Sequence, residues 1–119
     1  MRDFHKLPVW QKSHPLTLRV SRVTAACPEP EILGVTGQMR RAAASIETNL
    51  AEGCGRDSPL ELARFLPRAL GSAGELEGQT EIARDLGDGN GKQAAGWLVS
   101  ATEIKRMLAG LLKRLNTDN

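Results

Sequence analysis

The sequence predicts an all-α protein folded as an antiparallel up-down-up-down four-helix bundle. Apolar residues recur every three or four positions through four long segments, and strict apolar–polar alternation is absent. Ala and Leu dominate these segments, and Tyr is missing. The short connections between the segments favour antiparallel neighbours. A length of 119 residues is enough for one domain, so residues 1–119 are expected to form a single bundle.

The first helix is expected over about residues 8–26. Pro8 suits the first helical turn. Pro15 is incompatible with a regular helix interior, which predicts either a kink near residues 11–14 or a short first piece that holds Trp10. The run Cys-Pro-Glu-Pro at 27–30 is expected to end the helix and begin a linker. The apolar face consists of Leu16, Val20 and Val23.

The second helix is expected over about residues 35–54, with Gly53 and Gly55 at its end. It carries an apolar face of Met39, Ala42, Ala43, Ile46, Leu50 and Gly53. About a quarter turn away lies a polar face of Gln38, Arg41, Ser45, Asn49 and Glu52. Glu47 is the only charge between Ala42 and Ala51. A helix with so few outward charges is expected to be covered on more than one side.

The third helix is expected over about residues 59–87. Ser58-Pro59-Leu60-Glu61 has the pattern of a capping box with Pro at the first helical position. Pro67 is expected to bend the helix. Its small-residue face is either a solvent side or a site of close approach by a neighbouring helix, and consists of Pro67, Gly71, Gly74 and Gly78. The apolar face consists of Leu62, Phe65, Leu66, Ala69, Ala73, Leu76 and Ala83.

The fourth helix is expected over about residues 91–115, after a glycine-rich turn at 87–91. Asn90, followed by Gln93, can cap its N-terminus. Its apolar face consists of Trp97, Ala101, Ile104, Leu108, Leu111 and Leu115.

The polar face of the second helix has a counterpart on the third, made of Arg68, Ser72, Glu75 and Gln79. If the two lines face each other, they form a hydrogen-bonded network, and such networks add specificity more than stability. The alternative is an ordinary solvated face. The network interpretation predicts a subunit interface that includes Gln38, Arg41, Ser45, Asn49, Glu52, Ser72 and Glu75.

The charge distribution is uneven, although the net charge is only +2, from 16 Lys and Arg against 14 Asp and Glu. Residues 4–28 and 104–115 each contain four bases and no acid. These basic ends permit sequence-independent contact with a polyanion such as RNA or DNA, but a plain solvated face is equally compatible with them. The candidate polyanion contacts are Arg19, Arg22, Lys105, Arg106, Lys113 and Arg114.

No catalytic, cofactor-binding or metal-ligating set is predicted. His5 and His14 lack ligands at metal spacing and are expected to be solvent-exposed. Ser45 lies mid-helix without a nearby base, and no phosphate-binding loop is present. Cys27 and Cys54 are expected to be free thiols. No segment is apolar enough to cross a membrane, and the N-terminus lacks a signal-peptide pattern, so a cytoplasmic location is expected.

Several short motifs, in order and over almost the whole length, carry a family resemblance. They are Leu7-Pro-Val-Trp-Gln-Lys12, Gln38-Met-Arg-Arg-Ala-Ala-Ala-Ser45, Asn49-Leu-Ala-Glu-Gly53 with Gly55-Arg56, Arg64-Phe-Leu66, Ala69-Leu-Gly-Ser72 with Glu75-Leu-Glu77, and Ile82-Ala-Arg-Asp-Leu-Gly87. The chain thereby resembles the bacterial 23S rRNA intervening-sequence proteins. Glu47 departs from the family pattern, which commonly has Pro there.

The resemblance implies an antiparallel four-helix bundle that assembles as a ring-like pentamer and has no established enzymatic activity. One branch of the family resembles the accessory variability determinants of diversity-generating retroelements, which bind a reverse transcriptase and nucleic acid. Our first hypothesis is therefore a non-enzymatic homopentameric scaffold. The second is a nucleic-acid-binding accessory protein to such a reverse transcriptase. A small enzyme is the third and weakest hypothesis.

Overall fold

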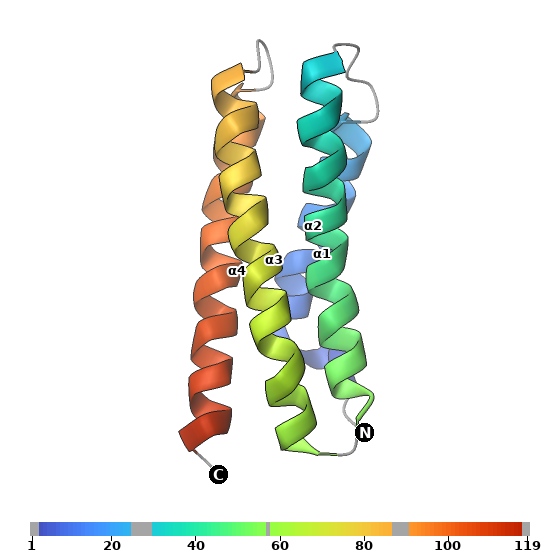
Figure 1. The fold of residues 1–119 in the computed structure, drawn as a ribbon, viewed down its shortest axis with the longest axis vertical. Helices are drawn as coiled ribbons and strands as arrows, with labels where there is room; N and C mark the ends of the chain where they lie inside the picture. Colours follow the sequence, from blue (N-terminus) through green and yellow to red (C-terminus); the bar gives the residue numbers. More distant parts are fainter. Residues whose placement is uncertain (1–2, 25–29, 57, 87–90, 118–119) are drawn as a thin grey trace.

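The computed structural model describes residues 3–24, 30–56, 58–86 and 91–117. It has one short 3₁₀ helix, η1 (Phe4–Lys6), and four α-helices: α1 (Pro8–Thr24), α2 (Pro30–Cys54), α3 (Pro59–Leu86) and α4 (Gly91–Thr117). These helices lie side by side in an elongated bundle of 47 × 20 × 19 Å (Figure 1). The described residues contain no strand, and the all-α prediction is confirmed.

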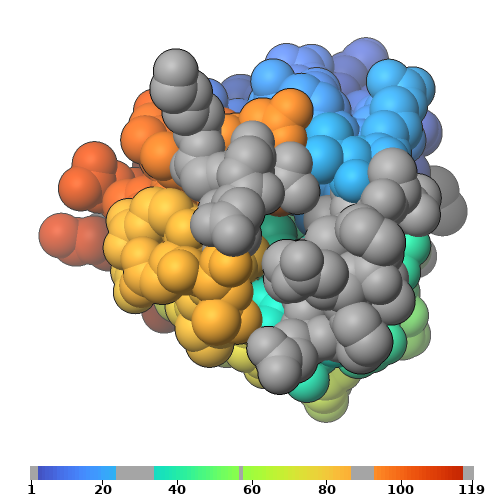
Figure 2. All heavy atoms as spheres, turned by 90° about the horizontal axis from the view of Figure 1, so that it is seen from above, coloured from blue at the N-terminus to red at the C-terminus, as the bar shows by residue number. Residues whose placement is uncertain are grey.

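The four α-helices form a closed cycle in which α1 contacts α2 and α4, and α3 contacts α2 and α4. Within the described helices the diagonal pairs make no such contact, so the α1–α4 side lies opposite the α2–α3 side. Seen from above, α1 and α4 are neighbours (Figure 2). Ser45 contacts Ser72, and Gln38, seven residues earlier, contacts Gln79, seven residues later. This register makes α2 and α3 antiparallel, as Figure 1 also shows.

The core lies along the common axis of the four helices and consists of the predicted apolar faces. Nearly every residue of those faces is buried, including Phe65 and Trp97. Val23, Ala83 and Leu111 are only partly buried and pack against the rim of the core. The fully buried large side chains include Leu16, Val20, Met39, Ile46, Leu50, Leu62, Leu66, Leu76, Ile104 and Leu108.

The start of α2 differs from the prediction. The helix begins at Pro30, whereas the sequence predicted a linker before Val35. Pro is tolerated at the first helical position, because the N–H it lacks would have no partner inside the helix. A single interior glycine such as Gly34 costs about 1 kcal/mol relative to Ala, which is too little to end a helix of this length.

The start of α3 follows the prediction in part. Ser58 precedes the helix and its hydroxyl accepts a hydrogen bond from the Leu60 N–H at 3.1 Å. Among the described residues the reciprocal arm of the predicted capping box does not form, because the Glu61 carboxylate instead accepts from Arg64 at 3.2 Å. The cap is therefore one-sided, and Glu61 stabilises the first turn through an i,i+3 ion pair.

Both internal prolines lie within continuous helices. Pro15 is inside α1 and Pro67 is inside α3, so the predicted separate first piece holding Trp10 is wrong. Both prolines are exposed. The carbonyl that each proline leaves without a helical partner can therefore bind water, which lowers the cost of keeping the helix intact.

Gly53 was predicted to help end α2, but it lies inside the helix and is buried. A Cβ atom there would lie 2.8 Å from Leu62 Cδ1 and 3.1 Å from Phe65 Cβ. Gly53 thus allows α3 to approach α2 closely. Gly55 follows the helix, and its N–H donates to the Ala51 carbonyl at 2.9 Å.

Candidate functional site, a polar groove between α2 and α3

The predicted polar faces of α2 and α3 contact each other at their central residues. The hydroxyls of Ser45 and Ser72 are hydrogen-bonded at 2.8 Å, and both residues are half-buried. The Asn49 amide donates to the Ser45 carbonyl at 2.8 Å and to its hydroxyl at 3.2 Å. Further along, Gln79 donates to Gln38 at 3.4 Å. The Ser45–Ser72 and Gln38–Gln79 contacts tie α2 to α3, and the Asn49 contacts stay within α2.

An open groove of about 490 Å³ lies between α2 and α3 along this line of contacts. Its lining is polar and consists of Gln38, Arg41, Ala42, Ser45, Ser72, Glu75 and Gln79. The Oε1 atom of Gln79 is buried and has no hydrogen-bond partner among the described residues. A buried acceptor without a partner is costly, so this end of the groove is incomplete in the single chain.

Two opposite charges stand at the edges of the groove. Arg41 on α2 and Glu75 on α3 are both exposed. Neither forms an ion pair with any part of the chain that the structure describes. The groove therefore presents one free cation and one free anion from adjacent helices.

The surface beside the groove is formed by small residues. Gly71, Gly74 and Gly78 lie on α3, and no atom of the described chain lies within 4 Å of a Cβ built on any of them. Among the described residues, the predicted close approach of a helix at this face therefore does not occur. Gly34 on α2 is equally open. Small side chains on both sides leave room for another backbone to come near.

Like Arg41 and Glu75, two further residues of the predicted lines stay outside the network. Glu52 is exposed and has no partner in the described ranges. Arg68 lies over the Phe65 ring, 5.0 Å from its centroid, and Arg56 lies over the same ring at 5.5 Å. The guanidinium of Arg68 is thus engaged with an aromatic face and not with a carboxylate.

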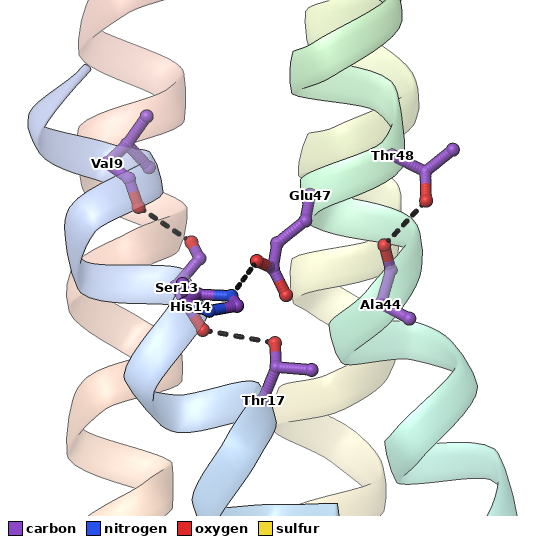
Figure 3. Close-up of polar contacts among 7 residues, drawn as sticks. All are labelled: Val9, Ser13, His14, Thr17, Ala44, Glu47 and Thr48. Atoms are coloured by element: carbon purple, nitrogen blue, oxygen red, sulfur yellow. Dashed lines mark hydrogen bonds and ion pairs between the residues drawn. The ribbon is translucent and has the colours of Figure 1, made fainter. Parts of the chain in front are cut away.

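A second polar contact joins α1 to α2 and was missed by the sequence reasoning (Figure 3). His14 Nδ1 lies 2.6 Å from Glu47 Oε1. The Glu47 side chain is 15% exposed, and the Trp10 ring stacks on the His14 ring at 4.7 Å. The His14 side chain is 43% exposed, as expected in part, but it has a partner that the sequence reasoning did not predict. The lone charge of Glu47 on a charge-poor helix was the available signal.

The His14–Glu47 pair does not complete a catalytic triad. The neighbouring hydroxyl of Ser13 is buried and donates to the Val9 carbonyl at 2.7 Å (Figure 3). That hydroxyl is therefore committed to its own helix and is not activated by His14, as nucleophilic catalysis would require. The described part of the chain also contains no cluster of three or more His, Cys, Asp or Glu residues able to hold a metal ion.

Some of the predicted polyanion contacts are unpaired among the described residues, and others already contact residues of the same chain. Arg19, Arg22, Arg106 and Arg114 are exposed, and none has an ion-pair partner in the described residues. All four lie on α1 and α4, opposite the polar groove. Lys113 is exposed but makes a contact within the chain.

Lys105 is a structural residue. It donates to Glu77 on α3 at 2.8 Å, and Thr102 donates to the same carboxylate at 2.7 Å. The hydrogen bond from Lys105, followed by that from Thr102, lowers the pKa of Glu77 from its ordinary value. On the other side of α4, Glu103 pairs with Lys12 of α1. These two contacts fasten α4 to both of its neighbours.

The fold and the groove together define a class: a helical-bundle protein with a polar, small-residue surface and no assembled catalytic centre in the residues described. None of its described helices is long and apolar enough to span a lipid bilayer.

The family model described as 23S rRNA-intervening sequence protein matches residues 5–110. The chain belongs to this family. It is also similar in fold to the crystal structure of a protein of unknown function of the S23 ribosomal protein family from Bacteroides thetaiotaomicron. That comparison has a TM-score of 0.75 and 22% sequence identity, and covers 88% of this chain and 95% of the other. No functionally curated protein matches the sequence.

Proposed function

We propose that the protein is a non-enzymatic scaffold that assembles with copies of itself through the α2–α3 face. The observation that carries the proposal is the incomplete groove: a hydrogen-bonded centre, a buried acceptor on Gln79, and an unpaired Arg41 and Glu75 at its edges. A second copy can supply both missing charges, because Arg41 of one subunit can pair with Glu75 of the next. The open glycine surface of α3 leaves room for this approach.

An Arg41–Glu75 pair between copies fits a two-fold dimer, in which the pair forms twice, and also a head-to-tail contact, which closes into a ring when the rotation between subunits allows it. The resemblance of the sequence implies a ring of five. We place the assembly in the cytoplasm; the buried Cys54 thiol, which forms no disulfide, fits a reducing compartment.

The test is the mass of the protein in solution, measured by light scattering after size exclusion. The wild-type chain should be an oligomer at micromolar concentration. Arg41→Glu and Glu75→Arg should each raise the dissociation concentration by about tenfold or more, because like charges would then face each other. The double variant, with the charges exchanged, should regain the wild-type mass.

Arg22→Glu is the matched control, since Arg22 is equally exposed but lies on α1. It should leave the mass unchanged. A wild-type chain that stays monomeric at micromolar concentration would refute the proposal. Dissociation by each single variant without recovery in the double variant would refute the Arg41–Glu75 pairing.

A second candidate function is favoured by the four unpaired arginines on α1 and α4. We propose that this surface contacts RNA or DNA, as an accessory protein to a reverse transcriptase would. Changing Arg19, Arg22, Arg106 and Arg114 together to Glu should abolish RNA binding. RNA binding should weaken linearly in a plot of log affinity against log salt concentration. Each single change of one of these arginines to Gln should make that slope shallower by less than about one. Binding that persists in the fourfold variant would exclude this surface.

A further inference from the structure

A hollow lies between the beginning of α1 and the last third of α4. Its volume is about 310 Å³, at the lower end of the roughly 300–1,000 Å³ typical of small-molecule sites. One wall is formed by Leu7–Val9, and the other by Met107, Gly110, Leu111 and Arg114. Except for the guanidinium of Arg114, these side chains are apolar. The hollow is on the α1–α4 side, so it is independent of the groove proposed for assembly.

Part of the hollow is open because Gly110, one of its lining residues, has no side chain. Gly110 lies inside α4, and no atom of the described chain lies within 4 Å of a Cβ built on it. A glycine in a helix interior costs about 1 kcal/mol relative to Ala. No close packing within the described structure requires this glycine, in contrast to Gly53. What it does provide is space beside Met107 and Leu111.

The only charged side chain among the residues that line the hollow is a cation. Arg114 is exposed and has no ion-pair partner in the described ranges. Residues 104–116 of α4 contain no acid. The first turn of α1 also contains no acid, and Leu7, which precedes it, has no side-chain acceptor to cap its N–H groups. An anion in the hollow would therefore meet the Arg114 guanidinium in the last turn of α4, and the positive N-terminal end of α1 would offset the negative C-terminal end of α4.

We propose that this hollow binds a small amphipathic monocarboxylate, such as a medium-chain fatty acid. The alkyl chain lies in the space beside Gly110, against Met107 and Leu111, and the carboxylate pairs with Arg114. A single cation among the lining residues matches a single negative charge, and a guanidinium accepts a carboxylate in a bidentate geometry.

The methionine methyl groups provide a direct test by NMR. The chain has three methionines, of which Met107 lines the hollow and Met39 is fully buried in the core. Adding decanoate below its micelle concentration should shift the Met107 methyl signal in a saturable way and leave the Met39 signal in place. Decanol and decyltrimethylammonium, which share the chain but not the negative charge, should bind at least tenfold more weakly.

Two variants separate the apolar and charged parts of the site. Gly110→Leu should fill the hollow, abolish the decanoate-dependent shift and raise the melting temperature. Gly96→Leu is its control, because Gly96 is also an open position inside α4 but does not line the hollow; it should bind decanoate normally. Arg114→Gln should weaken decanoate binding about tenfold.

Three results would overturn the proposal: no Met107 shift with millimolar decanoate, equal binding of decyltrimethylammonium and decanoate, or unchanged decanoate binding by Gly110→Leu. If Gly110→Leu fails to fold, the wild-type titrations and Arg114→Gln decide the question on their own.

Discussion

The contact between Glu77 and α4 makes a prediction about how stability depends on pH. Glu77 accepts hydrogen bonds from Thr102 and Lys105, and its side chain is 21% exposed. In Glu77→Gln the amide oxygen can still accept from Thr102, but the charge-assisted bond from Lys105 is lost. Lys105 is 40% exposed, so solvent screens the pair, and we expect a loss of only about 0.5–1 kcal/mol near neutral pH.

The pH dependence follows from the direction of the pKa shift. The hydrogen bonds from Lys105 and Thr102 lower the pKa of Glu77 in the folded state. The stabilisation is therefore fully present above the pKa of an unfolded glutamate, about 4.3, and is lost as pH falls through the lower folded value. A protonated Glu77 resembles Gln, so the difference between wild type and Glu77→Gln should shrink toward zero in that range.

Urea denaturation followed by circular dichroism, repeated from neutral to acid pH, measures this difference. Glu81→Gln is the control, because Glu81 lies on the same helix, is exposed and has no partner among the described residues. It should change stability little at any pH. A stability difference for Glu77→Gln that stays constant from neutral to acid pH would show that the carboxylate charge contributes nothing, and would refute the reasoning.

Two further predictions concern packing and the tie between α1 and α2. Gly53→Ala should destabilise the protein by about 1 kcal/mol or more, because the new methyl would lie 2.8 Å from a side-chain atom of α3, whereas Gly74→Ala should stabilise it by about 0.5–1 kcal/mol. Thermal melts compare the two, and effects of equal sign would contradict the packing. Glu47→Gln should weaken the bond to His14 by about 0.5–1.5 kcal/mol. Hydrogen exchange should then accelerate more in α1 than in α4; uniform acceleration would contradict this.

The helical periodicity of the apolar residues was sufficient to predict the fold class and nearly all of the core. Helix boundaries were less predictable where one residue type has two roles. Proline usually ends helices, which favours a linker at Pro30, but proline also suits a helix start. A glycine near a helix end, such as Gly53, favours termination, whereas Gly53 marks a close approach to α3. Only tertiary packing distinguishes these alternatives.

The candidate groove was predictable where both partners lay on regular polar lines, as for Ser45 and Ser72. The spacing within one helix could not show that Arg68 would turn to Phe65, or that Lys105 would be held by Glu77. The His14–Glu47 contact joins residues 33 positions apart and depends on how α1 is rotated against α2. That rotation is set by packing and is not encoded in either helix alone.

The positions of the two candidate surfaces connect assembly with polyanion binding. Because α1–α4 lies opposite α2–α3 in the cycle of helices, assembly through the groove would leave the four unpaired arginines of every subunit accessible. Several copies on one strand bind with avidity, which can exceed the affinity of one copy by roughly 10²–10⁴. Loss of assembly should therefore weaken RNA binding even though the arginines are untouched.

Glu75→Arg separates avidity from simple charge, because the two predict opposite results. The substitution makes each subunit more positive, so charge alone would tighten binding to a single-stranded RNA. If avidity dominates, the same variant should bind at least tenfold more weakly at concentrations where it dissociates. Fluorescence anisotropy with labelled RNA, run beside sedimentation of the same samples, measures both quantities. A dissociated Glu75→Arg protein that binds RNA as tightly as the wild-type oligomer would show that each subunit acts alone.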